Sequence, residues 1–535
     1  MSTPQTLEVV LLLLAVVLFG MSAARRLPIP YPVMLVGAGL LVSFVPGLPM
    51  LRLDPELVFF VFLPPVLWSA AYFTSLHDFR ANARPITLLA VGLVLATTAA
   101  VAVCARWLIP DLPWPVAVAL GAIVSPPDAV SATAVVRALG APRRIMTILE
   151  GESLVNDATA LILYRVAVAV AVGAVAFSPA ETALAFVLAA TVGVVLGWAI
   201  GRGAAQLLRL TNDAPSSILI TLMAPYLGWM LAEYAHASGV LACVAGGLTY
   251  RRASVTAVAP GARLQARPVW ELVVFVANGV LFLGIGLQLR NLVADVPAGG
   301  IRDLALQGAA IAGVVIAVRL VWVPLFAWLP RALSPALRAR DPMPTWQALF
   351  LLGWTGLRGI VSLAGAMALP LHLAGGAPFP HRSELLLLTF AVIFCTLVLQ
   401  GLTLAPLIRA LHFPSEGDPQ HEELEARAQA ARTALARLEE LAREPWAEAG
   451  ALGALREQYQ DRLRRASGGE SSLLADRAAK RARFESLLAE RLALDALRDH
   501  EQISDEVLLA LEAELDLEAA RHGLAELRRA DALLD

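Results

Sequence analysis

The chain has 535 residues, of which 58% are hydrophobic and only 16% are charged. Soluble domains contain about 25% charged residues, so this composition predicts several membrane spans rather than a globular core. The formal net charge of −2 gives no reason to expect nucleic acid as a partner. The cysteines lie far apart in apolar stretches and predict neither a disulfide nor a metal site: Cys104, Cys243 and Cys395.

Thirteen apolar segments are predicted as membrane spans, because most approach the ~20 residues that cross the hydrocarbon. The segment at 238–250 is short and follows its predecessor so closely that the two must form a tight hairpin. The predicted limits are 5–24, 29–46, 56–75, 85–109, 114–138, 145–173, 180–204, 216–235, 238–250, 268–289, 303–329, 346–371 and 384–411.

Arginine placement predicts the orientation, since cytoplasmic loops carry an excess of basic residues. With the N-terminus outside, the inner loops hold the arginine pairs at 25–26, 143–144 and 251–252 and many single arginines. The outer loops hold few: Arg52, Arg106, Arg290, Arg302 and Arg382. An odd number of spans then leaves the C-terminus in the cytoplasm, in a multi-pass protein of the plasma membrane.

The composition changes after residue 413, so we predict a transmembrane domain at 1–413 and a cytoplasmic helical domain at 414–535. The second segment is rich in Glu, Arg, Ala and Leu and has no run that could span a bilayer. Its helices are expected near 420–442, 448–466, 471–499 and 505–531, with breaks at Glu444-Pro445 and Gly468-Gly469 and an N-cap at Ser504. A solvated helical bundle explains this domain, and a regulatory or dimer-stabilising role is the alternative.

The fifth span contains two adjacent prolines at mid-depth, in the run Ser125-Pro126-Pro127-Asp128. Each proline removes a backbone donor and clashes with the preceding turn, so the helix should break there. Irregular backbone at that depth is tolerated only inside protein or beside a cavity, and broken helices are typical of secondary transporters. Asp128 could cap the second half-helix, bind an ion, or do both.

The sixth span carries a polar face. Residues four apart share a helix face, which places Glu152 beneath Asn156 and Ser153 beneath Asp157 in adjacent columns. Carboxylate, amide and hydroxyl oxygens are hard ligands that suit an alkali cation, whereas transition metals favour His and Cys. A charge at the centre of a span costs about 2.5–3.5 kcal/mol, so a purely structural cluster is a poor explanation of these acids.

The twelfth span has glycines at 353, 356 and 359 that favour close approach of another helix and ease a break. Arg358 lies among them and cannot lose its proton, so it needs a partner, for which Glu152 is our candidate. Arg319 in the eleventh span is also buried by position and could pair with a carbonyl or reach the interface.

These residues suggest a mechanism. A buried carboxylate without a cationic partner is costly to keep ionised, and either a proton or Na⁺ or Li⁺ can neutralise it. The two then compete for one site, and exchange follows if the site opens to either side only when neutralised. No phosphate-binding Gly-x-x-x-x-Gly-Lys-Ser/Thr loop occurs, so we expect neither an enzyme nor a cofactor.

Several runs resemble the Na⁺/H⁺ exchangers of the NhaP/NHE type over essentially all of residues 1–411. They are Ser125-Pro-Pro-Asp128-Ala-Val, Leu149-Glu-Gly-Glu152-Ser-Leu-Val-Asn156-Asp157-Ala, Gly353-Trp-Thr-Gly-Leu-Arg358-Gly and Phe59-Phe-Val-Phe-Leu-Pro-Pro65. The resemblance implies thirteen spans with inverted repeats and crossed broken helices, in a homodimer that works by an elevator-like motion.

The resemblance also implies roles for individual residues. Asp157 resembles the carboxylate that binds the ion and the proton, with Asp128 and Ser153 as further Na⁺ ligands. Asn156 is expected to hold the site together, and an Asn-Asp pair implies electroneutral exchange. Two departures stand out: many members carry a Thr ligand where this chain has Pro127, for which Ser125 or a carbonyl could substitute, and an acid where it has Trp68-Ser69.

Three alternatives follow from the same residues. K⁺ could replace Na⁺ or Li⁺ with an unchanged mechanism. A cation channel is less favoured because no repeated filter sequence occurs. An intramembrane aspartyl protease would use Asp128 and Asp157 as paired acids, but neither lies in a Gly-x-Gly-Asp setting, and Arg358 would be left unexplained.

Overall fold

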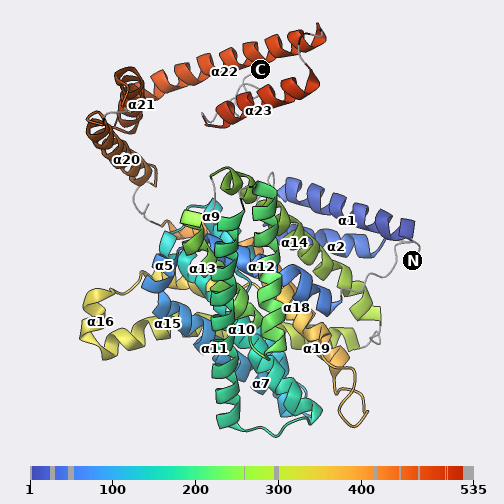
Figure 1. Ribbon diagram of the computed structural model, residues 1–535. Coiled ribbons are helices and arrows are strands. Elements are labelled where there is room, and N and C mark those ends of the chain that lie inside the picture. Colours follow the sequence, from blue (N-terminus) through green and yellow to red (C-terminus); the bar gives the residue numbers. More distant parts are fainter. Residues whose placement is uncertain are drawn as a thin grey trace. The chain divides into compact units, whose positions relative to one another are not determined.

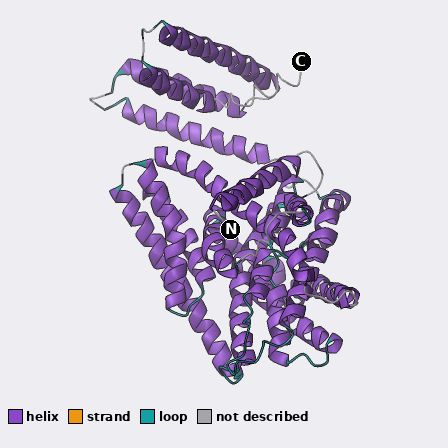
Figure 2. Ribbon diagram, turned by 90° about the vertical axis from the view of Figure 1, so that its right-hand side faces the viewer, coloured by secondary structure: helices purple, strands orange, loops and turns teal. Residues whose placement is uncertain are grey.

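The computed structural model describes residues 3–24, 30–45, 54–211, 213–257, 260–294, 300–413, 419–444, 447–467, 470–500, 502 and 504–521. Within them the regular structure is helical, apart from one isolated β-bridge between His372 and Pro378, so the all-α prediction is confirmed (Figure 2). The chain divides into two compact units, Met1–Pro414 and Ser415–Asp535.

The first unit is a bundle of helices (Figure 1). Its α-helices are α1 (Thr3–Ala24), α2 (Tyr31–Ser43), α3 (Pro55–Leu57), α4 (Leu63–Phe73), α5 (Leu76–Ala81), α6 (Ala83–Thr87), α7 (Val94–Leu108), α8 (Trp114–Val124), α9 (Ala129–Ala138), α10 (Arg143–Val172), α11 (Pro179–Leu207), α12 (Ala214–Tyr234), α13 (Gly239–Ala257), α14 (Pro260–Ala294), α15 (Gly300–Leu333), α16 (Pro335–Arg340), α17 (Trp346–Trp354), α18 (Ile360–Met367) and α19 (Arg382–Leu411). Two π-helical segments, η1 (Val58–Phe62) and η2 (Leu88–Leu93), and a 3₁₀ turn, η3 (Leu208–Leu210), join some of them.

Many of these helices have the length and apolar composition of membrane spans. In the described part of the chain, eight helical stretches are long and apolar enough to cross a bilayer, and three shorter apolar helices add to them. The predicted polytopic membrane protein is therefore confirmed, whereas the number thirteen stays a prediction. The segment expected at 238–250 is longer than predicted, because α13 continues to Ala257.

Small residues allow α11 and α13 to pack with their backbones in contact. A Cβ atom added at Gly197 of α11 would lie 2.2 Å from the carbonyl oxygen of Ala242 in α13. One turn to either side, Gly201 approaches the carbonyl oxygen of Gly246 in α13, and Gly193 approaches that of Ser238, the residue before α13. Membrane helices associate through such stripes of small residues, because lipid supplies no hydrophobic drive between helices.

Two broken helices lie in the interior of the bundle. The first consists of α8 and α9, separated by non-helical residues 125–128, and the second consists of α17 and α18, separated by residues 355–359. Both breaks fall in the predicted fifth and twelfth spans. The long helix α10 packs against α8, α9, α17 and α18 and thereby brings its polar face to both breaks.

The second unit contains four helices, α20 (Pro419–Leu441), α21 (Ala449–Ser467), α22 (Glu470–Asp499) and α23 (Asp505–Arg521). Their limits agree with the predicted segments to within a residue or two, except that 522–531 of the last one lies outside the described residues. The amide of Val507 donates a hydrogen bond of 3.3 Å to Ser504 Oγ, as the predicted N-cap requires. Pro445 and the glycine pair at 468–469 also lie outside the described residues.

Candidate functional site

The first break owes its shape to Pro126 and Pro127, which cannot continue the hydrogen-bond ladder of α8. Helix α8 ends at Val124, and α9 begins directly after Asp128. The Asp128 carboxylate accepts a hydrogen bond of 3.0 Å from the amide of Val130, so Asp128 is the N-cap of α9. The N-cap role that the sequence allowed for Asp128 is therefore present in the structure.

The second break crosses the first in direct contact. The backbone amide of Asp128 donates a 2.7 Å hydrogen bond to the carbonyl of Leu357. Gly359 packs against the Asp128 side chain so closely that an added Cβ would lie 2.6 Å from Oδ2. Glycine is therefore required at 359, and the Asp128 carboxylate lies at the N-terminal end of α18, where the helix dipole favours negative charge.

Arg358 contacts backbone carbonyls rather than Glu152, so the predicted pairing is wrong. The guanidinium donates to the carbonyls of Val124 (2.9 Å) and Ser125 (3.1 Å), and also to that of Gly356. These groups include the end of α8, whose last carbonyls have no intrahelical donors. Arg358 is 1% exposed, and the described residues give it no ion pair.

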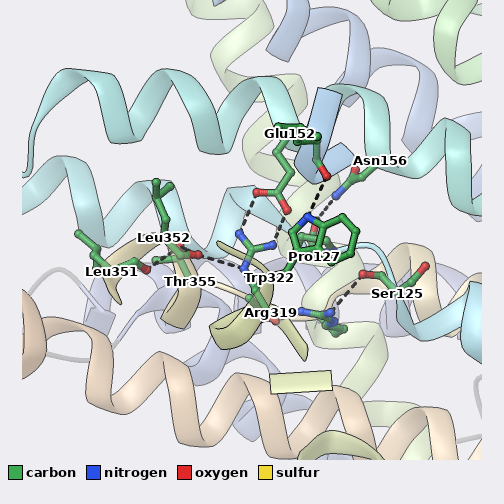
Figure 3. A network of polar contacts seen from close by, with 12 residues as sticks. Ser125, Pro127, Glu152, Asn156, Arg319, Trp322, Leu351, Leu352 and Thr355 are labelled. Carbon is green, nitrogen blue, oxygen red and sulfur yellow. Dashed lines mark hydrogen bonds and ion pairs between the residues drawn. The ribbon is translucent and has the colours of Figure 1, made fainter. Parts of the chain in front are cut away.

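The partner of Glu152 is Arg319, on α15. The guanidinium donates through both Nη atoms to the two carboxylate oxygens, and the Nη2 bond measures 2.8 Å (Figure 3). Its Nε donates at 3.0 Å to the carbonyl of Leu352, near the end of α17. Both side chains are 1% exposed. The sequence offered two arginines for one acid, and the bidentate geometry selects Arg319.

Asn156 ties α10 to the first break. Its Nδ2 donates a 3.0 Å hydrogen bond to the carbonyl of Pro127, which lost its helical donor when the helix broke (Figure 3). Asn156 is fully buried, and its Oδ1 has no hydrogen-bond partner in the described structure. This contact gives a physical reason why Asn156 would hold the site together, as the resemblance implies.

Asp157, Ser153 and Asp128 line one cavity of about 330 Å³ between the breaks and α10. Asp157 is 7% exposed. The predicted columns on α10 are therefore divided: the column of Ser153 and Asp157 faces the cavity, while Glu152 and Asn156 bind protein groups. Oxygen ligands from two elements around one space are suited to holding a small cation.

Sequence reasoning missed other polar residues of this cavity. Ser362 of α18 lines it, is 1% exposed, and has a hydroxyl without a hydrogen-bond partner in the described part of the chain. Ser69 of α4 and Asn278 of α14 also line it. Ser362 lies three residues after Gly359, so the glycine-rich run was a usable signal, but its unpartnered hydroxyl is visible only in the fold.

The cavity extends to a pair of charged residues at its rim. Arg137, in the last turn of α9, donates at 2.9 Å to Glu150, near the start of α10, and both line the cavity. The Arg137 side chain is 73% exposed. The space around Asp157 is therefore continuous with the end of the bundle where α9 ends and α10 begins.

A membrane bundle with two crossed broken helices, oppositely charged residues at the breaks and a carboxylate-lined cavity between them defines a secondary transporter. The sequence agrees, because residues 11–410 match the family model of the transmembrane sodium/hydrogen exchangers. The chain belongs to the sodium/hydrogen exchanger family.

Two relatives illustrate the likeness. An uncharacterized Na⁺/H⁺ exchanger of Mycobacterium tuberculosis is 34% identical over 521 residues, which cover 96% of this chain and 95% of that protein. The sodium, potassium, lithium and rubidium/H⁺ antiporter of Bacillus pumilus is 33% identical over 93% of this chain and 75% of its own length. The fold resembles the sodium proton antiporter MjNhaP1 of Methanocaldococcus jannaschii, with a TM-score of 0.60, 17% identity, and coverage of 78% of this chain and 100% of that one.

Proposed function

We propose that this chain exchanges Na⁺ or Li⁺ for H⁺, with cation and proton competing for the Asp157 carboxylate. The observation that carries the proposal is the shared cavity of Asp157, Asp128 and Ser153, in which Asp157 is 7% exposed. Burial disfavours an ionised carboxylate, so Asp157 changes access at low cost only with a proton or a cation bound.

Counting charges supports one-for-one, electroneutral exchange. Glu152 and Arg319 neutralise each other in a bidentate ion pair. Arg358 contributes one positive charge, while Asp128 and Asp157 contribute two negative charges when ionised. The site then carries one net negative charge, which one monovalent cation or one proton cancels. A large voltage dependence of transport would contradict this count.

Ser362 is the proposed replacement for the ligand that Pro127 lacks. The Ser125 hydroxyl already donates to the carbonyl of Ala122 at 3.0 Å, and the carbonyl of Pro127 accepts from Asn156. The Ser362 hydroxyl is free to turn toward an ion, because it has no hydrogen-bond partner in the described part of the chain and lines the same cavity as Asp157.

The orientation with the N-terminus outside is part of the proposal, as are the plasma membrane and the homodimer. The positive-inside rule supports it, since Arg137 and the arginines at 143–144 lie at one end of α9 and α10. The cavity that reaches Arg137 would then face the cytoplasm. Chemical cross-linking in native membranes tests the dimer, and accessibility of Cys introduced at 137 tests the orientation.

K⁺ remains the second candidate substrate, because the Bacillus pumilus relative is named for potassium as well as sodium. The same carboxylate site serves either ion. Selectivity depends on how closely the ligand oxygens can approach the ion. The transport assay therefore has to compare Na⁺, Li⁺ and K⁺ at equal ionic strength.

The test uses everted vesicles that carry an acid-inside pH gradient reported by a dye. Adding Na⁺ or Li⁺ should dissipate the gradient in wild-type vesicles, while Asp157→Asn should show only the background of empty vesicles. Asp54→Asn, which changes an exposed carboxylate, is the matched control and should behave like wild type. If Asp157→Asn vesicles respond like wild type, the assignment of the site is wrong.

A further inference from the structure

A second cavity, of about 360 Å³, lies beside the ion cavity and is not used by the exchange mechanism. Its walls come from α4, α12, α13 and α14. Phe73, at the end of α4, lines both cavities, so one helix end separates the two spaces. The residues around this second space differ in kind from those around Asp157.

Three arginines line the second cavity, and its described lining contains no acidic residue: Arg251, Arg263 and Arg267. Arg263 and Arg267 lie four residues apart on α14, so their like charges share a helix face and repel each other. Arg267 has an ion pair with Glu271, but those side chains are 73% and 59% exposed, so water screens that contact strongly.

Arg251 is held in place with donors to spare. Its Nη1 donates to the carbonyls of Tyr72 (3.0 Å) and Thr74 (2.9 Å) at the end of α4. A guanidinium has five N–H donors, and these bonds use one nitrogen, so the rest of the fork can bind an anion. Phosphate oxygens match that fork and accept two parallel bonds.

Aromatic side chains with fixed positions also line this cavity. Tyr250 packs against Trp68 and Tyr72, with ring centroids 6.0 and 5.6 Å apart. Trp270 is fixed by a 3.2 Å hydrogen bond from its Nε1 to Thr221 Oγ1. A cavity lined by both arginines and packed aromatic rings fits a ligand that has an anionic head and an apolar part.

We propose that this cavity binds a phosphate-type anion through Arg251, Arg263 and Arg267. Two sources share this chemistry, the headgroup of an anionic phospholipid and a soluble phosphate. In the proposed orientation the arginines lie at the cytoplasmic face, where anionic lipids attract basic residues. The site is distinct from the ion site, and its binding can be measured without transport.

The experiment uses the full-length protein in a nonionic detergent and measures its melting temperature. The probes are short-chain phosphatidylglycerol, phosphatidylcholine of equal chain length, and inorganic phosphate. Phosphatidylglycerol should raise the melting temperature by several degrees, and phosphatidylcholine should not. If inorganic phosphate alone gives the same shift, the soluble anion is the ligand. If phosphatidylglycerol raises the melting temperature and inorganic phosphate does not, the ligand is the phospholipid headgroup together with its acyl chains.

The variant Arg263→Gln/Arg267→Gln should lose roughly tenfold or more in apparent affinity for the active probe, because it removes two charge-assisted contacts. Arg202→Gln/Arg209→Gln is the matched control, since both arginines are exposed and the charge change is the same. Arg263→Lys/Arg267→Lys keeps the charge and should bind with intermediate affinity. An unchanged response of the double Gln variant overturns the proposal, as does an equal response to phosphatidylcholine.

Discussion

The two broken helices solve the same problem with different residues. In the first, prolines end α8, and an acid caps α9. In the second, glycines allow the break, and an arginine lies within it. Each break leaves the carbonyls at the end of its first half-helix without helical donors, and a buried arginine from another segment of the bundle donates hydrogen bonds there. Arg358 donates hydrogen bonds to the carbonyls at the end of α8, and Arg319 donates one to a carbonyl near the end of α17.

The difference between these arginines lies in their counter-charge. Arg319 has Glu152 as a bidentate partner, whereas the described residues give Arg358 only backbone oxygens. One arginine is therefore part of a neutral structural pair, whereas the other has no ion pair with the described residues. The comparison shows that equal placement at helix ends does not imply equal electrostatic roles.

The largest effect is expected for Arg358→Met. The change leaves three buried carbonyls without their donor, each at roughly 1–3 kcal/mol. We expect a large drop in the melting temperature measured by size-exclusion chromatography after heating, or loss of folded protein. Arg302→Met, at an exposed position, should melt like wild type. A stable Arg358→Met protein would mean that the end of α8 has other donors.

Glu152→Gln should be the next most damaging change, since it leaves the Arg319 charge buried without its partner. Breaking a buried ion pair costs roughly 3–5 kcal/mol. The double variant Glu152→Gln/Arg319→Met should recover part of the lost melting temperature, because no buried charge is then left over. Glu152→Gln/Arg358→Met should show no such recovery. If only Glu152→Gln/Arg358→Met recovered stability, Glu152 would pair with Arg358, as the sequence led us to expect.

Two substitutions of Asp128 separate its role as the N-cap of α9 from its proposed role as a cation ligand. Asn is as good an N-cap as Asp, so Asp128→Asn should keep the melting temperature, while Asp128→Ala should lose about 1 kcal/mol of stability. Both variants remove the carboxylate from the cavity, so Na⁺-driven dissipation of the pH gradient should fall about tenfold or more in each. Normal exchange by Asp128→Asn would limit this residue to capping.

The smallest effect is expected for Ser362→Ala, which removes a hydroxyl that has no hydrogen-bond partner in the described part of the chain. The melting temperature should stay the same. Loss of one ligand worth about 1 kcal/mol should raise the KM for Na⁺ about fivefold. Adding Pro127→Thr should lower that KM again if both positions supply the same ligand. An unchanged KM in Ser362→Ala would exclude its hydroxyl from the site.

The features that local chemistry controls could be predicted from the sequence. The proline pair ended α8 where expected, Asp128 capped α9, and helical periodicity placed Ser153 and Asp157 on one face. The choice between Arg319 and Arg358 depended on which helices are neighbours in space, which spacing along one helix cannot reveal.

The unpartnered hydroxyl of Ser362 could not be predicted for a related reason. A serine or threonine in an apolar helix usually bonds to the carbonyl one turn earlier, as Thr396 of α19 does with Val392 at 2.9 Å. Ser362 follows the break, in the first turn of α18, where the preceding residues are not helical and offer no such carbonyl. The Ser362 hydroxyl therefore has no hydrogen-bond partner in the described residues because the helix is interrupted just before it.

The hydrogen bond from the Asp128 amide to the Leu357 carbonyl fastens the two unwound segments to each other at 2.7 Å. Pulling them apart would strand two polar backbone groups in an apolar interior, which is costly. In the proposed exchange the two unwound segments would therefore move as one piece, and a change of access would occur around them. An ion that crosses by this route would leave the same set of oxygens that received it, so we expect the intrinsic affinities for Na⁺ at the two faces to be alike.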